Sequence, residues 1–202
     1  LTSALGNDKE GFKLLELIEA SKLEVTIAQD HKITTTKTRL VGQRGQHIVR
    51  WDREVPYVGD VSERFNNNIK KNDIVCISDY AKGTVKRDTV GKLLDKDIKI
   101  LVDPKQDSKF YHGAFLVKPN MQEYETWFGK YDKDNALLQM KKLDWTWLVV
   151  TDGANGMHVL NSYGEYKHFV EPVKEVADVT GAGDTVMAVS YTHLRAHETE
   201  AY

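Results

Sequence analysis

The chain has 202 residues, of which 41% are hydrophobic and 29% are charged, and its formal net charge at pH 7 is −2. This composition is typical of a soluble globular protein, and the length suffices for one domain with or without a small accessory. The charge balance gives no basic excess of the kind that nucleic acids or anionic membranes attract as bulk partners. No stretch of the sequence approaches the roughly 20 apolar residues that span a bilayer.

The cysteine content and the first residues bear on localisation. Cys76 is the one cysteine, and it lies in the apolar run DIVCIS, where we expect a small core residue. One cysteine excludes an intrachain disulfide framework and fits a reducing compartment. The opening residues LTSALGNDKEGF lack the basic and apolar segments of a signal peptide. We therefore expect a cytoplasmic protein.

The first third of the chain predicts a helix followed by a β-hairpin. Leu14, Leu17 and Ile18 share one helical face within residues 8–21, and Asn7 or Asp8 can cap that helix. Residues 33–43 and 47–54 are β-prone and are joined by the turn sequence QRGQ. We interpret residues about 33–54 as a small β-flap, or lid, that closes over a site, and we expect a helix at 60–71.

The remainder of the chain alternates strands with helices. A buried strand at 73–79 is followed by a helix at 84–96, strands at 98–104 and 114–120, helices at 121–129 and 135–144, a strand at 145–153 and a hairpin at 156–170. This alternation predicts an α/β fold with right-handed crossovers. Within it, Trp145 and Trp147 are expected to pack in the core.

Polar residues stand at the end of one predicted strand after another. In open α/β sheets, ligands bind at the carboxyl ends of the strands, so these residues indicate a site. The residues are Ser78 and Asp79, Asp103 and Lys105, Lys118, Thr151, and finally Asp178, Thr180 and Asp184.

The sharpest motif is DVTGAGDT, at residues 178–185. Gly181 and Gly183 let the backbone approach a ligand closely, and free N–H groups at a helix start bind phosphate. Asp184 would lie in the first turn of that helix, where it could accept a proton from a substrate hydroxyl. The alternative is a glycine-rich turn in which Asp184 merely favours the start of the helix. The motif is neither a P-loop nor the dinucleotide-binding G-x-G-x-x-G.

The segment Asp178–Asp184 resembles the signature of the ribokinase-like (PfkB-type) carbohydrate kinases, and the resemblance extends over residues about 1–189. It implies a three-layer α/β sandwich with a mostly parallel sheet and a lid. It also implies that Asp184 is the catalytic base, that the amides of Gly181, Ala182 and Gly183 form an anion hole, and that Asp178 and Thr180 contact the cofactor.

Two further segments match motifs of the same family. VKPNMQEYE matches the Asn-x-x-Glu element as Asn120 and Glu123, which implies a role with Mg²⁺ and phosphate, with the metal held through water. VVTDGANGM matches the nucleotide-side element as Thr151, Gly153 and Gly156, so ATP and Mg²⁺ are the expected cofactors. Asn120 could instead be a plain helix N-cap, with Glu123 completing a capping box.

Cationic residues suit a substrate that carries a phosphate group. Lys37, Arg39, Lys82 and Lys105 are the expected substrate-binding residues, and Lys105 is the best single candidate because it follows a strand end. The predicted flap also carries Arg44, Arg50 and Arg53. A solvated, charged hairpin is the alternative interpretation of these flap residues.

A narrower likeness is to the heptose-7-phosphate kinases, and it rests on TTTKTRLVGQRGQHIVRWDRE, ISDYAKGTV and ILVDPKQDSKFYHGAFLVKPNMQEYE. It implies phosphorylation of heptose 7-phosphate by ATP to the 1,7-bisphosphate, on the route to ADP-heptose and the lipopolysaccharide core. Two alternatives stay open. One is a PfkB-type kinase of another sugar, a hexose, a pentose or their phosphates; the other is a non-catalytic nucleotide-binding fragment.

The ends of the chain lead to further expectations. The sequence begins after the usual start of the family's sugar-binding region, and residues 190–202 resemble non-native sequence, so we expect a fragment truncated at both ends and inactive by itself. His193 and His197 in that tail lack a third metal ligand. The resemblance also implies a possible homodimer through the lid and a possible fused nucleotidyltransferase domain outside this chain.

Overall fold

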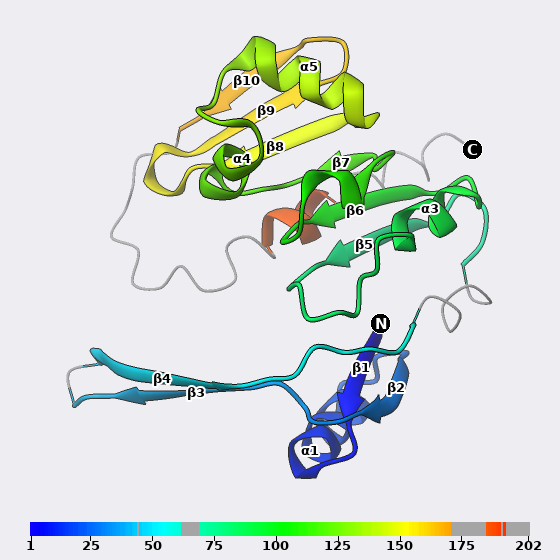
Figure 1. Ribbon diagram of the computed structural model, residues 1–202, viewed down its shortest axis with the longest axis vertical. Helices are drawn as coiled ribbons and strands as arrows, with labels where there is room; N and C mark the ends of the chain where they lie inside the picture. Colours follow the sequence, from blue (N-terminus) through cyan, green and yellow to red (C-terminus); the bar gives the residue numbers. More distant parts are fainter. Residues whose placement is uncertain (44, 62–68, 171–184, 191, 193–202) are drawn as a thin grey trace. The chain divides into compact units, whose positions relative to one another are not determined.

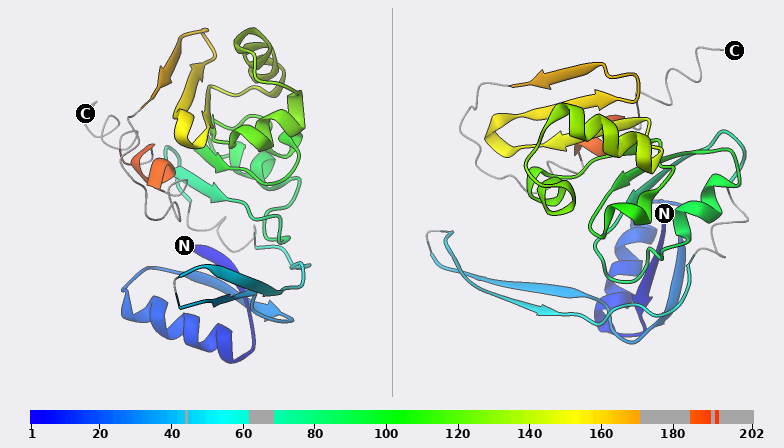
Figure 2. Two further views of the ribbon diagram at one scale, coloured as in Figure 1. Left: turned by 90° about the vertical axis from the view of Figure 1, so that its left-hand side faces the viewer. Right: turned by 45° about the horizontal axis from the view of Figure 1, so that its top comes forward.

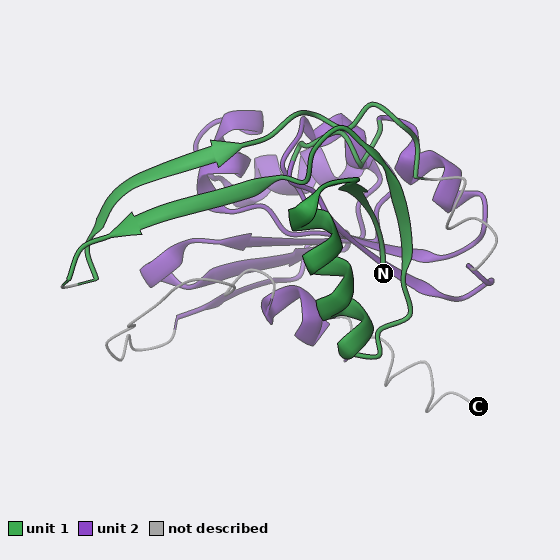
Figure 3. Cartoon of the chain, turned by 90° about the horizontal axis from the view of Figure 1, so that it is seen from below, with its two compact units in different colours: residues 1–68, 81–86 green, residues 69–80, 87–202 purple. Residues whose placement is uncertain are grey.

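The computed structural model describes residues 1–43, 45–61, 69–170, 185–190 and 192. The chain divides into two compact units, shown in separate colours in Figure 3. Unit 1 comprises Leu1–Asn68 and Ala81–Lys86, and unit 2 comprises Ile69–Tyr80 and Arg87–Tyr202.

Unit 1 begins with a strand, a helix and a parallel strand. β1 (Thr2–Gly6) pairs in parallel with β2 (Thr26–His31), and α1 (Lys9–Ala20) connects them. Of the two predicted caps, Asp8 caps the helix, because its Oδ1 accepts the N–H of Gly11 at 2.9 Å. β2 was not predicted, because four of the six residues of its segment TIAQDH are polar and the segment resembles a loop.

The predicted flap is a two-stranded antiparallel hairpin of β3 (Thr36–Val41) and β4 (His47–Arg53), the long ribbon in Figure 1. Its register places Leu40 opposite Val49 and Thr38 opposite Trp51, while Lys37 faces Asp52 and Arg39 faces Arg50. Because alternate residues of a strand point to opposite faces, one face of the hairpin is largely apolar and the other is charged.

Unit 2 contains a six-stranded sheet in the order β10-β9-β8-β7-β6-β5. The strands β5 (Ile74–Ser78), β6 (Lys99–Asp103), β7 (Leu116–Val117) and β8 (Trp147–Thr151) run parallel. The strands β9 (Met157–Asn161) and β10 (Tyr166–Phe169) add an antiparallel hairpin beside β8. This is the mostly parallel α/β sheet that the sequence predicts.

Helices lie on both faces of this sheet (Figures 1 and 2). One face carries α4 (Met121–Phe128) and α5 (Lys133–Leu143), with α3 (Thr89–Leu94) near β6. On the opposite face, Met187 of the helix at 185–190 packs in one cluster with Leu101, Leu116 and Val149. Two short 3₁₀ turns, η1 (Ser108–Tyr111) and η2 (Gly153–Asn155), complete the unit.

Four predictions, two about single residues and two about helices, have different outcomes. Trp145 is 2% exposed, as expected for a core residue. The helix predicted at 84–96 is wrong in its first part, because residues 81–86 belong to unit 1, where Lys82 and Lys86 hydrogen-bond the backbone of Tyr57. Cys76 is exposed rather than buried, because it lies on the edge strand β5. The helix predicted at 60–71 lies mostly outside the described residues.

Within the described part of the chain, no helix combines the length and the apolar character that crossing a membrane requires.

Candidate functional site

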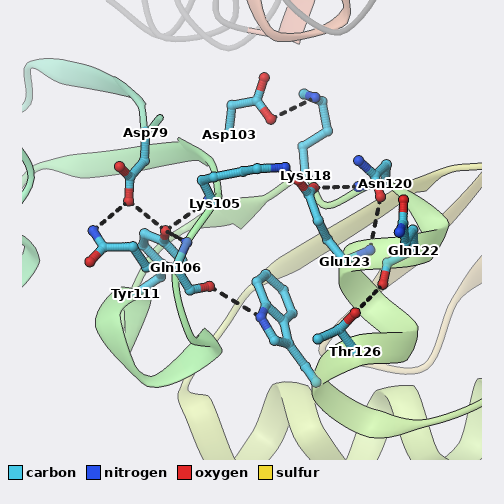
Figure 4. Close-up of polar contacts among 11 residues, drawn as sticks. Asp79, Asp103, Lys105, Gln106, Tyr111, Lys118, Asn120, Gln122, Glu123 and Thr126 are labelled. Atoms are coloured by element: carbon cyan, nitrogen blue, oxygen red, sulfur yellow. Dashed lines mark hydrogen bonds and ion pairs between the residues drawn. The ribbon is translucent and has the colours of Figure 1, made fainter. Parts of the chain in front are cut away.

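The carboxyl ends of the parallel strands in unit 2 form one continuous polar edge. Backbone hydrogen bonds join the ends: the N–H of Asp79 donates to the carbonyl of Asp103 at 2.9 Å, and that of Thr151 donates to the carbonyl of Pro119 at 3.1 Å. Asn120 and Thr151 also form a parallel bridge. The structure therefore brings together, as predicted, most of the polar residues that follow these strands (Figure 4).

Glu123 is held at this edge by a capping box at the start of α4. Asn120 Oδ1 accepts the N–H of Glu123 at 2.8 Å, and Glu123 Oε2 accepts the N–H of Asn120 at 3.0 Å. The capping-box alternative is thus confirmed, but it leaves the other carboxylate oxygen to face the strand ends. That atom, Oε1, accepts a charge-assisted hydrogen bond from Lys105 Nζ at 2.8 Å.

Lys118 forms a second ion pair, deeper in the same edge. Its side chain is 5% exposed, and its Nζ donates to Asp103 Oδ1 at 2.9 Å. An ammonium group removed from water in this way requires a counter-charge, so Asp103 and Lys118 constrain one another.

A third group of contacts surrounds Tyr111, which the sequence analysis did not single out. Tyr111 is fully buried, and its hydroxyl donates to Asp79 Oδ2 at 2.7 Å. The same hydroxyl accepts the N–H groups of Lys105 at 2.9 Å and of Gln106 at 2.8 Å. Burial, and secondarily the hydrogen bond to Asp79, raises the pKa of Tyr111 far above its ordinary value. Nothing in the local sequence DSKFYHGA distinguishes this tyrosine from a core residue.

The loop after β8 contains the remaining described residues of the predicted nucleotide side. Thr151 ends β8, and the chain then passes through η2 to Gly156, whose φ is +92°. A Cβ at Gly156 would collide with the carbonyl oxygen of Phe169 on β10. Gly153 also has positive φ, at +51°, but a Cβ there would meet open space. Glycine is therefore required at 156 by both conformation and packing.

The other predicted substrate residues lie in unit 1. Lys37 and Arg39 are exposed on β3, and Lys82 forms an ion pair with Glu54. Asp178, Thr180, Gly181, Ala182, Gly183 and Asp184, together with Arg44 of the flap, lie outside the described residues.

The described carboxylates could bind Mg²⁺ together with water and a phosphate ligand. No group of three or more His, Cys, Asp or Glu side chains gathers anywhere in the described ranges, so they offer no all-protein metal cage. Mg²⁺ commonly binds through one or two carboxylates and substrate phosphates and keeps several waters. Each carboxylate oxygen has two lone pairs, so Glu123 retains accepting capacity beside its contacts with Lys105 and Asn120.

Comparison with known proteins gives consistent matches. Residues 1–199 match the pfkB family carbohydrate kinases. The chain is 33% identical over 209 residues to the bifunctional protein HldE of Pasteurella multocida, covering 96% of this chain and 43% of that protein. It is 33% identical over 220 residues to the protein of the same name from Haemophilus influenzae, covering 100% of this chain and 46% of the relative. The chain thus spans less than half the length of these relatives.

Solved structures show the same fold at lower identity. Phosphofructokinase-2 from Escherichia coli, in complex with potassium, superposes with a TM-score of 0.77 at 19% identity, covering 96% of this chain and 68% of that one. Ribokinase from Giardia lamblia gives 0.71 at 16% identity, covering 92% of this chain and 64% of that one. The fold is therefore ribokinase-like, and the chain belongs to the pfkB family of carbohydrate kinases.

Proposed function

We propose that this chain provides the kinase activity of an enzyme that transfers the γ-phosphoryl group of ATP to a sugar phosphate. The observation that carries the proposal is the polar edge of unit 2, where Lys105 and Glu123 meet at 2.8 Å beside the predicted nucleotide loop. Residues about 1–189 would form the kinase domain. Heptose 7-phosphate, converted to the 1,7-bisphosphate, is the substrate favoured by the likeness of residues 34–54, 77–85 and 100–125 to heptose-7-phosphate kinases.

The roles of the edge residues follow from their charges. The transferred phosphoryl group passes through a loose transition state, so positioning and charge stabilisation provide most of the catalysis. Lys105, which is 54% exposed, can release Glu123 and bind a phosphate oxygen. Glu123 and Asn120 would then hold Mg²⁺ through water, and the bound ion would neutralise negative charge on the ATP phosphates.

The remaining roles rest on the signature and the glycine loop. Asp184 would accept the proton of the attacking sugar hydroxyl, while the amides of Gly181, Ala182 and Gly183 would bind the developing anion. On the ATP side, the cofactor contacts would come from Thr151, Gly153, Gly156, Asp178 and Thr180. On the sugar side, Lys37, Arg39 and Lys82 would join Lys105 in binding the substrate.

The central test is the substitution Asp184→Asn, made in the chain together with the sequence that flanks it in its gene. A coupled assay of ADP release with heptose 7-phosphate should show kcat reduced by about 10²–10⁴-fold, the usual cost of losing a positioned base. Asp95→Asn, at the end of α3, is the control and should retain full activity. Full activity in Asp184→Asn would refute the assignment of the base.

A panel of sugars distinguishes the alternatives. Faster turnover of a hexose, a pentose or one of their phosphates would support a sugar kinase with a substrate other than heptose 7-phosphate. Binding of ATP without turnover of any sugar would favour a non-catalytic nucleotide-binding protein instead.

The assembly is a separate part of the proposal. Leu40, Val49 and Trp51 share the apolar face of the hairpin, and Trp51 is 74% exposed. We propose that this face forms a homodimer, and Trp51→Glu should then shift the sedimenting species to the monomer. The relatives are named bifunctional and are more than twice as long as their match to this chain, which supports a second, nucleotidyltransferase domain beyond it.

A further inference from the structure

The hydroxyl of Tyr111 uses all of its hydrogen-bonding capacity inside unit 2. A phenol can donate one hydrogen bond and accept two. Tyr111 donates to Asp79 Oδ2 at 2.7 Å and accepts the backbone N–H groups of Lys105 and Gln106 at 2.9 and 2.8 Å. A buried hydroxyl that is fully satisfied in this way fixes the groups around it more firmly than packing alone.

These bonds converge on one short loop, residues 104–107 between β6 and η1. Gln106 also bonds through its side chain and its carbonyl: its Nε2 donates to Asp79 Oδ2 at 2.8 Å, and its carbonyl accepts from Trp127 Nε1 at 3.1 Å. Tyr111 is itself anchored, because Trp145 Nε1 donates to its carbonyl oxygen at 2.8 Å. The loop is therefore held by Asp79, which follows β5, by Tyr111 of η1 (Figure 4) and by Trp127 of α4.

Lys105 is the cationic residue of this loop, and its side chain is exposed. Its backbone N–H is bound by Tyr111, whereas its side chain is 54% exposed and meets Glu123. A lysine side chain has four rotatable bonds and a large rotamer entropy, so the direction of its backbone decides which region its ammonium group can reach. The two bonds accepted by Tyr111 set that direction.

We propose that Tyr111, itself held by Asp79, is a positioning residue that directs the Lys105 ammonium group toward the phosphate of the bound ligand. This inference rests on the proposed function, because it assigns the ligand of Lys105 as a phosphate group. Tyr111 is completely buried and so cannot touch that ligand. It acts through the backbone of Lys105.

Tyr124 supplies a matched control for this proposal. It is also fully buried in unit 2, but its hydroxyl has no hydrogen-bond partner among the described residues. Tyr111→Phe and Tyr124→Phe each remove one buried hydroxyl and preserve an aromatic ring. Only Tyr111→Phe removes the hydrogen bonds to the backbone of Lys105 and Gln106. General effects of losing a buried hydroxyl should therefore appear in both variants, and effects on the position of Lys105 in Tyr111→Phe alone.

The experiment combines two measurements on the chain with its native flanking sequence. Hydrogen exchange should become faster at the amides of Lys105 and Gln106 in Tyr111→Phe and stay unchanged there in Tyr124→Phe. In kinase assays, Tyr111→Phe should raise the KM for the sugar phosphate more than it lowers kcat, with kcat/KM falling about 10- to 100-fold. In Lys105→Met, the further change Tyr111→Phe should then have little effect, because both act through one ammonium group.

Each outcome decides the proposal. Accelerated exchange together with non-additive losses supports it. Unchanged exchange at both amides overturns it, and so do losses that multiply in the double variant, because these indicate a structural role independent of Lys105. An unsubstituted protein that phosphorylates no sugar would instead refute the proposed function, and the positioning role would fall with it.

Discussion

The hairpin of unit 1 and the strand ends of unit 2 are both rich in cations, but they hold them in different ways. On the hairpin, Arg50 pairs with Asp52 at 2.9 Å while 54% of its side chain remains exposed. At the strand ends, Lys118 pairs with Asp103 at the same distance with only 5% of its side chain exposed. The N···O distances are equal and the side chains of Asp52 and Asp103 are each 25% exposed, so the two pairs differ in the cation and in its exposure to water.

This difference separates two kinds of candidate residue. An exposed pair is screened by water and contributes little, so a hairpin cation is free to exchange its partner for a ligand. A pair that includes a buried charge is hard to break, because removal of either partner leaves an uncompensated charge away from water. Lys105 combines features of both, because its side chain is as exposed as that of Arg50 while its backbone N–H is bound by buried Tyr111, and this combination suits its proposed role in binding a ligand.

The largest expected effect comes from breaking the ion pair between Asp103 and the buried Lys118. Asp103→Ala should lower the free energy of unfolding by about 3 kcal/mol, because it removes the carboxylate that neutralises the buried Lys118 ammonium. Asp52→Ala, which breaks the hairpin pair with Arg50, should cost about 0–1 kcal/mol. Urea denaturation of both variants measures the difference. Equal losses would show that burial does not distinguish these two ion pairs.

A smaller loss of stability is expected when glycines in the same two regions are replaced by alanine. Gly156→Ala should cost about 2 kcal/mol, because its φ of +92° is strained for alanine and its Cβ would meet the Phe169 carbonyl. Gly45→Ala, in the hairpin turn with φ of +76° and open space around it, should cost about 1 kcal/mol. Thermal unfolding of the two variants tests this order, and a costlier Gly45→Ala would contradict it.

The smallest effect concerns Asp8, an acidic group of unit 1 that is held as firmly as those of unit 2. The side-chain hydrogen bond from Thr34 at 2.6 Å, then the N–H groups of Thr34 and Gly11, and finally Arg53, lower the pKa of Asp8 below its usual 3.8. A lowered pKa stabilises the folded state above the unfolded value, and that stabilisation is lost as the pH falls through the folded value.

Asp8→Asn should therefore be less stable than the unsubstituted protein at neutral pH, and the gap should narrow below about pH 4. Denaturation curves recorded from pH 7 down to pH 3 measure this gap. A gap that stays constant with pH would mean that the charge of Asp8 does not contribute to stability.

Local patterns in the sequence were sufficient to predict much of the fold. The alternation of apolar strands and amphipathic helices predicted β5 to β8 with α4 and α5, and QRGQ between β-prone runs predicted the hairpin. Asn120 and Glu123 were identified both as a family motif and as a capping box, and the structure has the capping box. These features depend on residues a few positions apart, so a single sequence contains them.

The sequence by itself thus determined the α/β class, the hairpin and the series of polar residues after the strands. Only the tertiary structure decided which of them meet. Asp79 and Tyr111 are 32 positions apart, and Lys105 and Glu123 are 18 apart, so no local period records their contacts. The tertiary structure also showed that residues 81–86 belong with Tyr57 in unit 1 rather than to a helix. Packing between distant segments selects such partners, whereas hydrophobic periodicity specifies only the elements that carry them.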